Sequence, residues 1–225
     1  MPIPKIIHQF WISPNNQDIP EDIKKNIQSW EATHPDYIRM MWSLSGLSPL
    51  LEDFYGLNLL KSINECRFPA MQSDIIRLAL IYEYGGFWSD LKNYILRPFV
   101  NELIAQDRVI LLEHRPANIL AKYHPWLENG FLGAPEKNKY IWMWLENAVQ
   151  NIEQRKKRGV VGLTGAGVMM RLMAELNNSG IKCNYHLIKH NDFWNSKVKR
   201  SGGSYNDNNQ HWSIRQKIES PFIDL

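Results

Sequence analysis

The N-terminal part of the chain alternates between strand and helix patterns, and this alternation limits the fold more than any other feature. Residues 5–12 (KIIHQFWI) form a short, nearly continuous apolar run, which is typical of a strand buried on both faces. Apolar side chains then recur at helical spacing from position 19 to position 30, and residues 37–42 resume the strand pattern. A strand, a helix and a second strand in so short a span predict a right-handed crossover between parallel strands.

The rest of the chain continues the alternation. We expect helices at 48–55, 71–84, 139–152 and from the turn at 164–167 to 176, and strands at 87–89, 109–113, 130–134 and 183–188. The tandem Gly85 and Gly86 predict the end of the second of these helices, because glycine readily takes the left-handed conformation found there. No repeat or linker interrupts the pattern. The predicted fold class is therefore α/β, one domain with a mostly parallel central sheet flanked by helices.

The composition excludes several classes of protein. A chain of 225 residues with 44% hydrophobic residues can bury a substantial core, and a net charge of +3 is too small to indicate nucleic-acid binding. The longest apolar runs, 78–82 and 141–145, are far shorter than a membrane-spanning helix. The two cysteines cannot form a disulfide framework, and the N-terminus lacks a secretory pattern. We therefore expect a cytoplasmic protein.

Three segments together carry a family resemblance. They are IPKIIHQFWI at 3–12, SDIIR at 73–77 and YGGFWSD at 84–90; LTGAG at 163–167 and HW at 211–212 add weaker support. The chain resembles the DXD-motif, family 32-like glycosyltransferases. These sugar-nucleotide-dependent enzymes include yeast-type initiating mannosyltransferases, clostridial toxin glucosyltransferases and bacterial capsule or O-antigen enzymes. The second and third segments match the S-D-x-x-R and Y-G-G-x-x-x-D pattern of that family in both sequence and spacing.

The resemblance implies a GT-A, Rossmann-like fold, with a nucleotide-sugar half at about 1–115 and an acceptor half with a C-terminal lid at about 116–225. It implies transfer with retention from a nucleotide-diphosphate sugar, UDP favoured over GDP. The acceptor would be a capsule or lipopolysaccharide glycan, free or lipid-linked. By position, Trp11 would flank the base, Asp74 and Arg77 would hold the donor sugar, and Asp90 would be the first carboxylate of the D-x-D. Further donor-binding candidates are Ser73, Trp88, Gly165, His211 and Trp212.

The chain departs from the family at the second carboxylate of the motif, where it has Lys92. An ammonium group cannot coordinate Mn²⁺ or Mg²⁺. One interpretation is metal independence, with Lys92 neutralising the leaving diphosphate and Arg77 assisting as a second cation. The other is that Asp90 keeps a metal with help from Asn93, His211 or a C-terminal carboxylate. A degenerate protein that binds nucleotide sugar or glycan without turnover is the alternative function.

Several candidates also have simpler interpretations. Asp74 and Arg77 would be an ordinary surface ion pair, and Trp11 and Trp88 core aromatics. Asn129 is a catalytic candidate near the reacting carbon or part of a turn. No protein nucleophile can be named.

Four further features have expected roles: His8, the turn at 164–167 and two polar segments. His8 is a core histidine rather than a base, and residues 164–167 form either a plain turn or an anion site. Residues 155–158 form either a solvated helix end or a contact with anionic lipid at the membrane. Residues 201–210 are expected to be a mobile loop before a lid.

Overall fold

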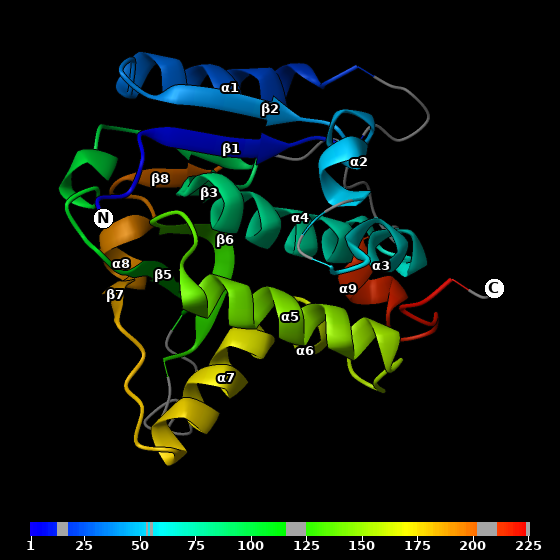
Figure 1. Ribbon diagram of the computed structural model, residues 1–225. Coiled ribbons are helices and arrows are strands. Elements are labelled where there is room, and N and C mark those ends of the chain that lie inside the picture. Colours follow the sequence, from blue (N-terminus) through cyan, green and yellow to red (C-terminus); the bar gives the residue numbers. More distant parts are fainter. Residues whose placement is uncertain (13–17, 53, 55, 116–124, 202–210, 224–225) are drawn as a thin grey trace.

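The computed structural model describes residues 1–12, 18–52, 54, 56–115, 125–201 and 211–223 (Figure 1). The elements in chain order are β1 (Ile6–Phe10), α1 (Glu21–Thr33), β2 (Ile38–Trp42), α2 (Leu44–Glu52), α3 (Leu59–Glu65), α4 (Pro69–Tyr84), β3 (Gly86–Ser89), β4 (Asn93–Ile95), the 3₁₀ helix η2 (Val100–Glu102), β5 (Val109–Glu113), β6 (Leu127–Ala134), α5 (Lys139–Glu153), α6 (Val160–Leu163), α7 (Ala166–Asn178), β7 (Tyr185–Ile188), α8 (His190–Phe193), β8 (Val198–Arg200) and α9 (Trp212–Arg215).

The central sheet has six strands in the order β2-β1-β3-β6-β5-β7. β1 pairs in parallel with β2 and β3, and β5 pairs in parallel with β7, whereas β6 runs antiparallel to both of its neighbours. The predicted α/β fold with a mostly parallel sheet is confirmed, with β6 as the reversed strand. β4 and β8 form a separate antiparallel pair that the sequence did not predict.

Helices cover both faces of the sheet. Apolar residues of α4, α5 and α7 form one core cluster with one face, and Trp30 of α1 and Phe193 of α8 belong to a second cluster on the other face. Figure 1 shows α4, α5 and α7 stacked on one side. In β3, Phe87 packs in the second cluster and Trp88 in the first, because successive side chains of a strand point to opposite faces of the sheet. No helix in the described ranges is long and apolar enough to cross a membrane.

The Gly85–Gly86 pair lies where the sequence predicts a helix end. Both residues have positive φ, 62° and 91°, and the N–H of Gly85 donates to the carbonyl of Ile81. A Cβ atom on Gly86 would lie 2.7 Å from the carbonyl oxygen of Ile6. Glycine is therefore needed both for the backbone conformation and for the close packing of β3 against β1.

Some predicted boundaries were wrong. The helix expected at 48–55 is α2, which begins at Leu44 and ends at Glu52. The strand expected at 130–134 starts three residues earlier, at Leu127, so Asn129 lies in β6 and the interpretation as a turn was wrong. α3 and the short α6 were not predicted.

Candidate active site

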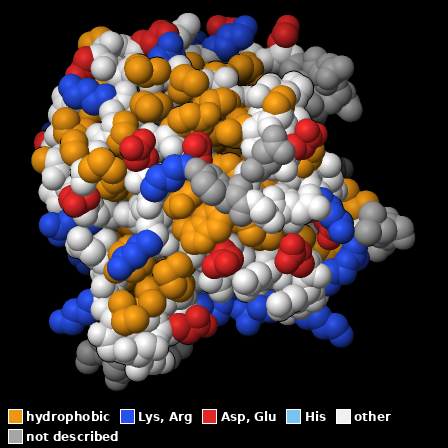
Figure 2. All heavy atoms as spheres, in the orientation of Figure 1, with side chains coloured by type: hydrophobic (Ala, Val, Ile, Leu, Met, Phe, Trp, Pro, Cys, Tyr) orange, Lys and Arg blue, Asp and Glu red, His pale blue; other side chains and the backbone are white. Residues whose placement is uncertain are grey.

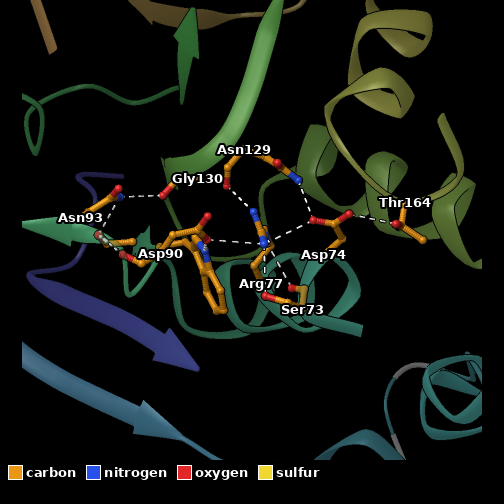
Figure 3. A network of polar contacts seen from close by, with 10 residues as sticks. Ser73, Asp74, Arg77, Asp90, Asn93, Asn129, Gly130 and Thr164 are labelled. Carbon is orange, nitrogen blue, oxygen red and sulfur yellow. Dashed lines mark hydrogen bonds and ion pairs between the residues drawn. The ribbon is translucent and has the colours of Figure 1, made fainter. Parts of the chain in front are cut away.

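Arg77 on α4 lies between two carboxylates (Figure 3). Its Nη2 atom is 3.2 Å from Asp74 Oδ1 and 3.5 Å from Asp90 Oδ1, and it also donates to Ser73 Oγ over 3.1 Å. Its Nη1 donates to the backbone carbonyl of Asn129. Asp74 and Arg77 are both buried, so their interpretation as an ordinary surface ion pair was wrong. The Asp90 side chain is 41% exposed, which makes it the carboxylate of the pair that solvent or a ligand can reach.

Asp74 joins α4 to two distant parts of the chain. Asn129 Nδ2 donates to its Oδ1 over 2.8 Å, and Thr164 Oγ1 donates to its Oδ2 over 2.9 Å. Burial raises the pKa of Asp74, while Arg77, Thr164 and Asn129 oppose that rise. Because Asn129 and Thr164 donate to its oxygens and Arg77 pairs with it as a cation, the network is arranged for an ionised carboxylate. Gly165 is packed against the same group, because a Cβ atom there would lie 3.3 Å from Asp74 Oδ2.

Asp90 begins a tight turn at the end of β3. The N–H of Asn93 donates to the carbonyl of Asp90 over 3.0 Å, and the Asn93 amide donates to the carbonyl of Gly130 over 2.9 Å. Trp88 Nε1 donates to Asp90 Oδ1 over 2.8 Å. That oxygen therefore faces both Trp88 and Arg77. The second oxygen, Oδ2, lies beside Gly130, where an added Cβ atom would approach to 3.1 Å.

The aromatic candidates differ in position. Trp88 is 1% exposed and belongs to the core, so the predicted direct donor contact is not available to it in this structure; it contacts Asp90 instead, and Arg77 stacks over its ring. Trp11 is half-buried directly after β1, and its backbone N–H donates to the carbonyl of Trp42. Because β1 pairs in parallel with β3, Trp11 lies near the same end of the sheet as Asp90. The predicted contact of Trp11 with the nucleotide base is therefore carried forward as a proposal.

His8 is a core histidine, as the simpler interpretation predicted. Its Nδ1 atom accepts from Trp42 Nε1 over 3.1 Å, and its Nε2 is 2.9 Å from the carbonyl of Gly85. Because the indole can only donate, the ring carries its proton on Nε2. Burial lowers the pKa of His8 to about 4, which keeps the imidazole neutral.

Lys92 is held in the turn by its backbone. Ser201 donates its N–H to the Lys92 carbonyl over 2.9 Å, and the Asn26 amide donates to the carbonyl of Leu91 over 2.8 Å. Burial lowers the pKa of the half-buried Lys92 ammonium, the Asp90 charge raises it, and the Arg200 charge lowers it. This places the Lys92 charge close to the exposed carboxylate.

His211 and Trp212 lie at the start of α9. Burial lowers the pKa of His211, and the nearby Lys92 charge lowers it further. His211 Nδ1 accepts from the N–H of Ser213, and the half-buried Trp212 packs against the core that contains α4. His211 is therefore brought close to Lys92. Of the predicted mobile loop at 201–210, residues 202–210 lie outside the described residues.

The residues at this turn do not fit a hard divalent cation, which prefers several oxygen ligands. Asp90 supplies one carboxylate, whose Oδ1 already faces Trp88 and Arg77, and Lys92 stands where the second carboxylate is expected. Asn93 is buried, and its amide nitrogen is fixed by donating to Ser89 and Gly130, so its amide oxygen does not face the exposed edge of Asp90 as a second ligand open to solvent. Within the described ranges no group of three or more His, Cys, Asp or Glu side chains is arranged to hold a metal ion. The C-terminal carboxylate that one interpretation invoked lies outside those ranges.

Sequence reasoning missed several members of the network. Thr164 belongs to the LTGAG motif and precedes Gly165, which was a candidate site residue. The motif could therefore have indicated that Thr164 lies at the site as well. Asn26 and Ser201, which fix the turn at Lys92, gave no signal, because they approach it from distant parts of the chain.

The fold is that of GT-A-type glycosyltransferase domains. The structure titled "PaToxG Glycosyltransferase" is 22% identical and superimposes with a TM-score of 0.54, covering 80% of this chain and 74% of that one. The UDP-bound glycosyltransferase domain from the YGT toxin is 9% identical, with a TM-score of 0.51 over 88% of this chain and 80% of that one. These similarities show the fold.

The segment that carries the site is similar to a known family. Residues 20–110, which contain Asp74, Arg77 and Asp90, match the family described as "Glycosyltransferase sugar-binding region containing DXD motif". Over this part of the chain the predicted resemblance to the DXD-motif glycosyltransferases is confirmed.

Two yeast proteins are similar to parts of this chain. The inositol phosphoceramide mannosyltransferase 2 of Schizosaccharomyces pombe is 27% identical over 155 residues, which are 69% of this chain and 40% of the relative. The mannosyl phosphorylinositol ceramide synthase SUR1 of Saccharomyces cerevisiae is 33% identical over 89 residues, which are 40% of this chain and 22% of the relative. The chain thus spans less than half the length of these relatives.

Proposed function

We propose that this chain transfers a hexosyl residue from a nucleotide-diphosphate sugar to a glycan or lipid-linked glycan. The observation that carries the proposal is the position of Arg77 between the buried Asp74 and the exposed Asp90, beyond the end of β3. Ligands of α/β sheets bind at such strand ends. The match of residues 20–110 to a sugar-binding region supports the same location.

Each group of the network has a proposed role. The free edge of Asp90 accepts hydrogen bonds from hydroxyl groups of the donor, while Trp88 and Arg77 hold the carboxylate in place. Ser73 and Asn129 fix the guanidinium of Arg77, and Asn129 also fixes Asp74. The turn at Gly165, which opens the 13-residue helix α7, places a helix N-terminus against the buried Asp74 carboxylate and so stabilises its charge, because helix N-termini favour anions. Trp11 flanks the base, and His211 and Trp212 contact the donor from the C-terminal side.

Lys92 is proposed to supply the positive charge that a divalent ion would otherwise provide at the diphosphate. As the bond between the sugar carbon and the diphosphate oxygen breaks, negative charge develops on the leaving group. An ammonium group close to that oxygen stabilises the charge as a point cation. With retention, the acceptor oxygen forms the new bond on the same face, and its proton passes to the departing phosphate. Retention itself is supported by the family resemblance alone.

The donor and acceptor are proposed at the level of chemical class. Of the two relatives described above, one is named a mannosyltransferase and the other a mannosyl phosphorylinositol ceramide synthase, whereas the similar toxin domain was solved with UDP. We retain UDP as the favoured nucleotide and a capsule or lipopolysaccharide glycan as the acceptor. The division into a nucleotide-sugar half at 1–115 and an acceptor half at 116–225 is part of the same proposal. The free thiols of Cys66 and Cys183 support a cytoplasmic location.

A donor panel tests the function directly. Purified protein is incubated with UDP- and GDP-linked hexoses, with and without glycan acceptors, and free nucleotide and glycosylated product are measured. Acceptor-dependent release of one nucleotide supports the transferase, and Asp90→Asn should abolish it. Tight nucleotide-sugar binding without release or product across the panel would instead support the degenerate protein that binds without turnover.

A further inference from the structure

The C-terminal segment 211–223 packs against the basic run that follows α5. Arg155 Nη2 donates to the carbonyl of Ile223 over 3.3 Å, and the Arg155 guanidinium lies over the ring of Phe222. Gln216 Oε1 accepts from the N–H of Val160 over 3.0 Å. These contacts bring residues 155–161 and 211–223 together on one surface, although about fifty residues separate them in the sequence.

This surface exposes apolar side chains that the core does not use. Ile218 is 85% exposed, and Val161, Ile214 and Ile223 are also exposed. Ile214 lies in α9, and Ile218 lies in the turn that directly follows this helix, where its N–H donates to the carbonyl of Arg215. An isoleucine exposed to this extent loses nothing by leaving water, and its burial in an apolar phase is favourable.

Basic side chains come from the same segments and from α7, where Arg171 Nη2 donates to the carbonyl of Gly162, the neighbour of Val161. They are Arg155, Lys156, Lys157, Arg158, Arg171 and Lys217. The two arginines at 158 and 171 are close enough that the Arg158 charge lowers the pKa of Arg171, after the larger effect of burial. Figure 2 shows basic side chains projecting from the rim of the molecule near the end of α5.

The acidic groups nearby neutralise only part of this charge. Glu219 is bound by Arg215 through two hydrogen bonds of 2.8 and 2.7 Å, and Glu175 faces Arg171. Glu153 is exposed in the last turn of α5. The six basic residues therefore leave the surface with a net positive charge. We call these six residues, together with Val161, Ile214, Ile218 and Ile223, the basic–apolar surface.

We propose that the basic–apolar surface docks this protein on an anionic lipid bilayer. Isoleucine side chains enter the apolar boundary of the bilayer while lysine and arginine contact the acidic headgroups. Binding to nucleic acid would account for the basic side chains but not for the exposed isoleucines, since bases are bound by stacking on aromatic or planar side chains. The combination of both kinds of side chain favours lipid.

The basic–apolar surface adjoins the candidate active site. A Cβ atom on Gly165 would lie 3.1 Å from Val161 Cα and 3.3 Å from Asp74 Oδ2, and the intervening Thr164 donates to Asp74. These distances place Val161 beside Asp74, the buried carboxylate of the network. Docking would therefore hold the network close to the bilayer, where a lipid-linked acceptor is held. This consequence rests on the proposed function, whereas the docking itself does not.

Sedimentation with vesicles tests the docking. The full chain is mixed with vesicles of phosphatidylcholine alone or of phosphatidylcholine with phosphatidylserine, and bound protein is measured at low and high salt. We expect binding to the anionic vesicles that salt weakens. Ile218→Glu and the double variant Lys157→Glu/Lys217→Glu should each weaken it about tenfold or more. Matched controls are Ile38→Glu on β2, where the isoleucine is 61% exposed, and Lys24→Glu/Lys25→Glu on α1; both should bind like the wild type.

The outcomes separate the two proposals. Donor hydrolysis in the absence of vesicles should be unchanged in the docking variants, so loss of docking with intact hydrolysis supports the surface. Equal binding to neutral vesicles, or equal losses in the control variants, overturns it. So does salt-sensitive binding to DNA as tight as that to the anionic vesicles. If the protein docks but shows no transfer with any donor, the docking stands and the proposed function fails.

Discussion

Trp88 and Asp90, two residues apart at the end of β3, are joined by a hydrogen bond of 2.8 Å from the indole Nε1 to Oδ1. The indole is 1% exposed while the carboxylate is 41% exposed, so a core side chain holds one oxygen of a carboxylate whose other edge faces outward. Residues i and i+2 of an extended chain lie on one side, which brings these two groups together. The tryptophan thus positions Asp90 without needing to touch the donor.

Trp88→Phe should leave the fold intact and impair the reaction. The variant removes a hydrogen bond to a charged group, which is worth about 1.5–3 kcal/mol, so kcat/KM for donor cleavage should fall about tenfold or more. Trp30→Phe is the matched control, because Trp30 is also buried and its Nε1 has no hydrogen-bond partner among the described residues. Equal kcat/KM values in the two variants, measured beside their thermal unfolding, would remove the positioning role.

Arg77→Gln should destabilise the protein strongly. The substitution leaves Asp74 buried without its cation, and breaking a buried pair in this way costs about 3–5 kcal/mol. Arg39→Gln removes a partly exposed partner of Glu31 and should cost no more than about 1 kcal/mol. Urea unfolding of both variants provides the comparison. Similar small losses of unfolding free energy in both variants would show that the Arg77 network contributes little to stability.

Thr164→Val tests whether the α6–α7 turn depends on its contact with Asp74. Valine keeps the shape of the side chain but leaves Oδ2 without its hydroxyl donor, so we expect a loss of about 1.5–3 kcal/mol in unfolding free energy. Thr164→Ser keeps the hydroxyl and should recover most of that loss. Because Asp74 belongs to the proposed donor site, nucleotide-sugar binding should also be weaker in Thr164→Val than in Thr164→Ser.

The stability of the protein should fall in mild acid because of two buried histidines. Burial lowers the pKa values of His8 and His34 from 6.5 to about 4. Between these values the unfolded chain binds protons that the folded chain does not, so the free energy of unfolding decreases as the pH falls through this window. Each histidine contributes about 3 kcal/mol to the loss. A His8→Gln variant should lose less stability than the wild type between about pH 7 and about pH 4.5; identical losses in denaturant titrations contradict the assignment.

Local features of the fold were predictable from the sequence. Gly85 and Gly86 marked the end of α4 because positive φ angles select glycine, and the strand-end position of Asp90 followed from the strand pattern before it. The direction of β6 was not predictable, since its apolar residues would suit either direction. The pairing of β4 with β8 joins segments about a hundred residues apart, each too short to give a periodic signal.

The sequence allowed us to predict which residues belong to the site, but not how they are arranged. The motifs identified Asp74, Arg77 and Asp90, and the structure brings them together. Spacing alone gave no indication that Asp74 is buried, because its partners Asn129 and Thr164 come from β6 and from the turn before α7. Trp88 had two interpretations, a donor contact and a core aromatic, and its burial agrees with the second. The sequence could not decide between them because it does not show which face of a strand is covered.

The central claim of the proposed function is that Lys92 supplies the positive charge that a divalent metal ion would otherwise provide at the diphosphate. Calorimetric titration of UDP and GDP into the wild type, Lys92→Ala and Lys92→Asp, each in EDTA and again with Mn²⁺, tests it most directly. We predict that the wild type binds one of the two nucleotides in EDTA, that Lys92→Ala loses this binding, and that Lys92→Asp regains it only with Mn²⁺. Binding by the wild type that appears only with Mn²⁺, or that is unchanged in Lys92→Ala, would contradict the account.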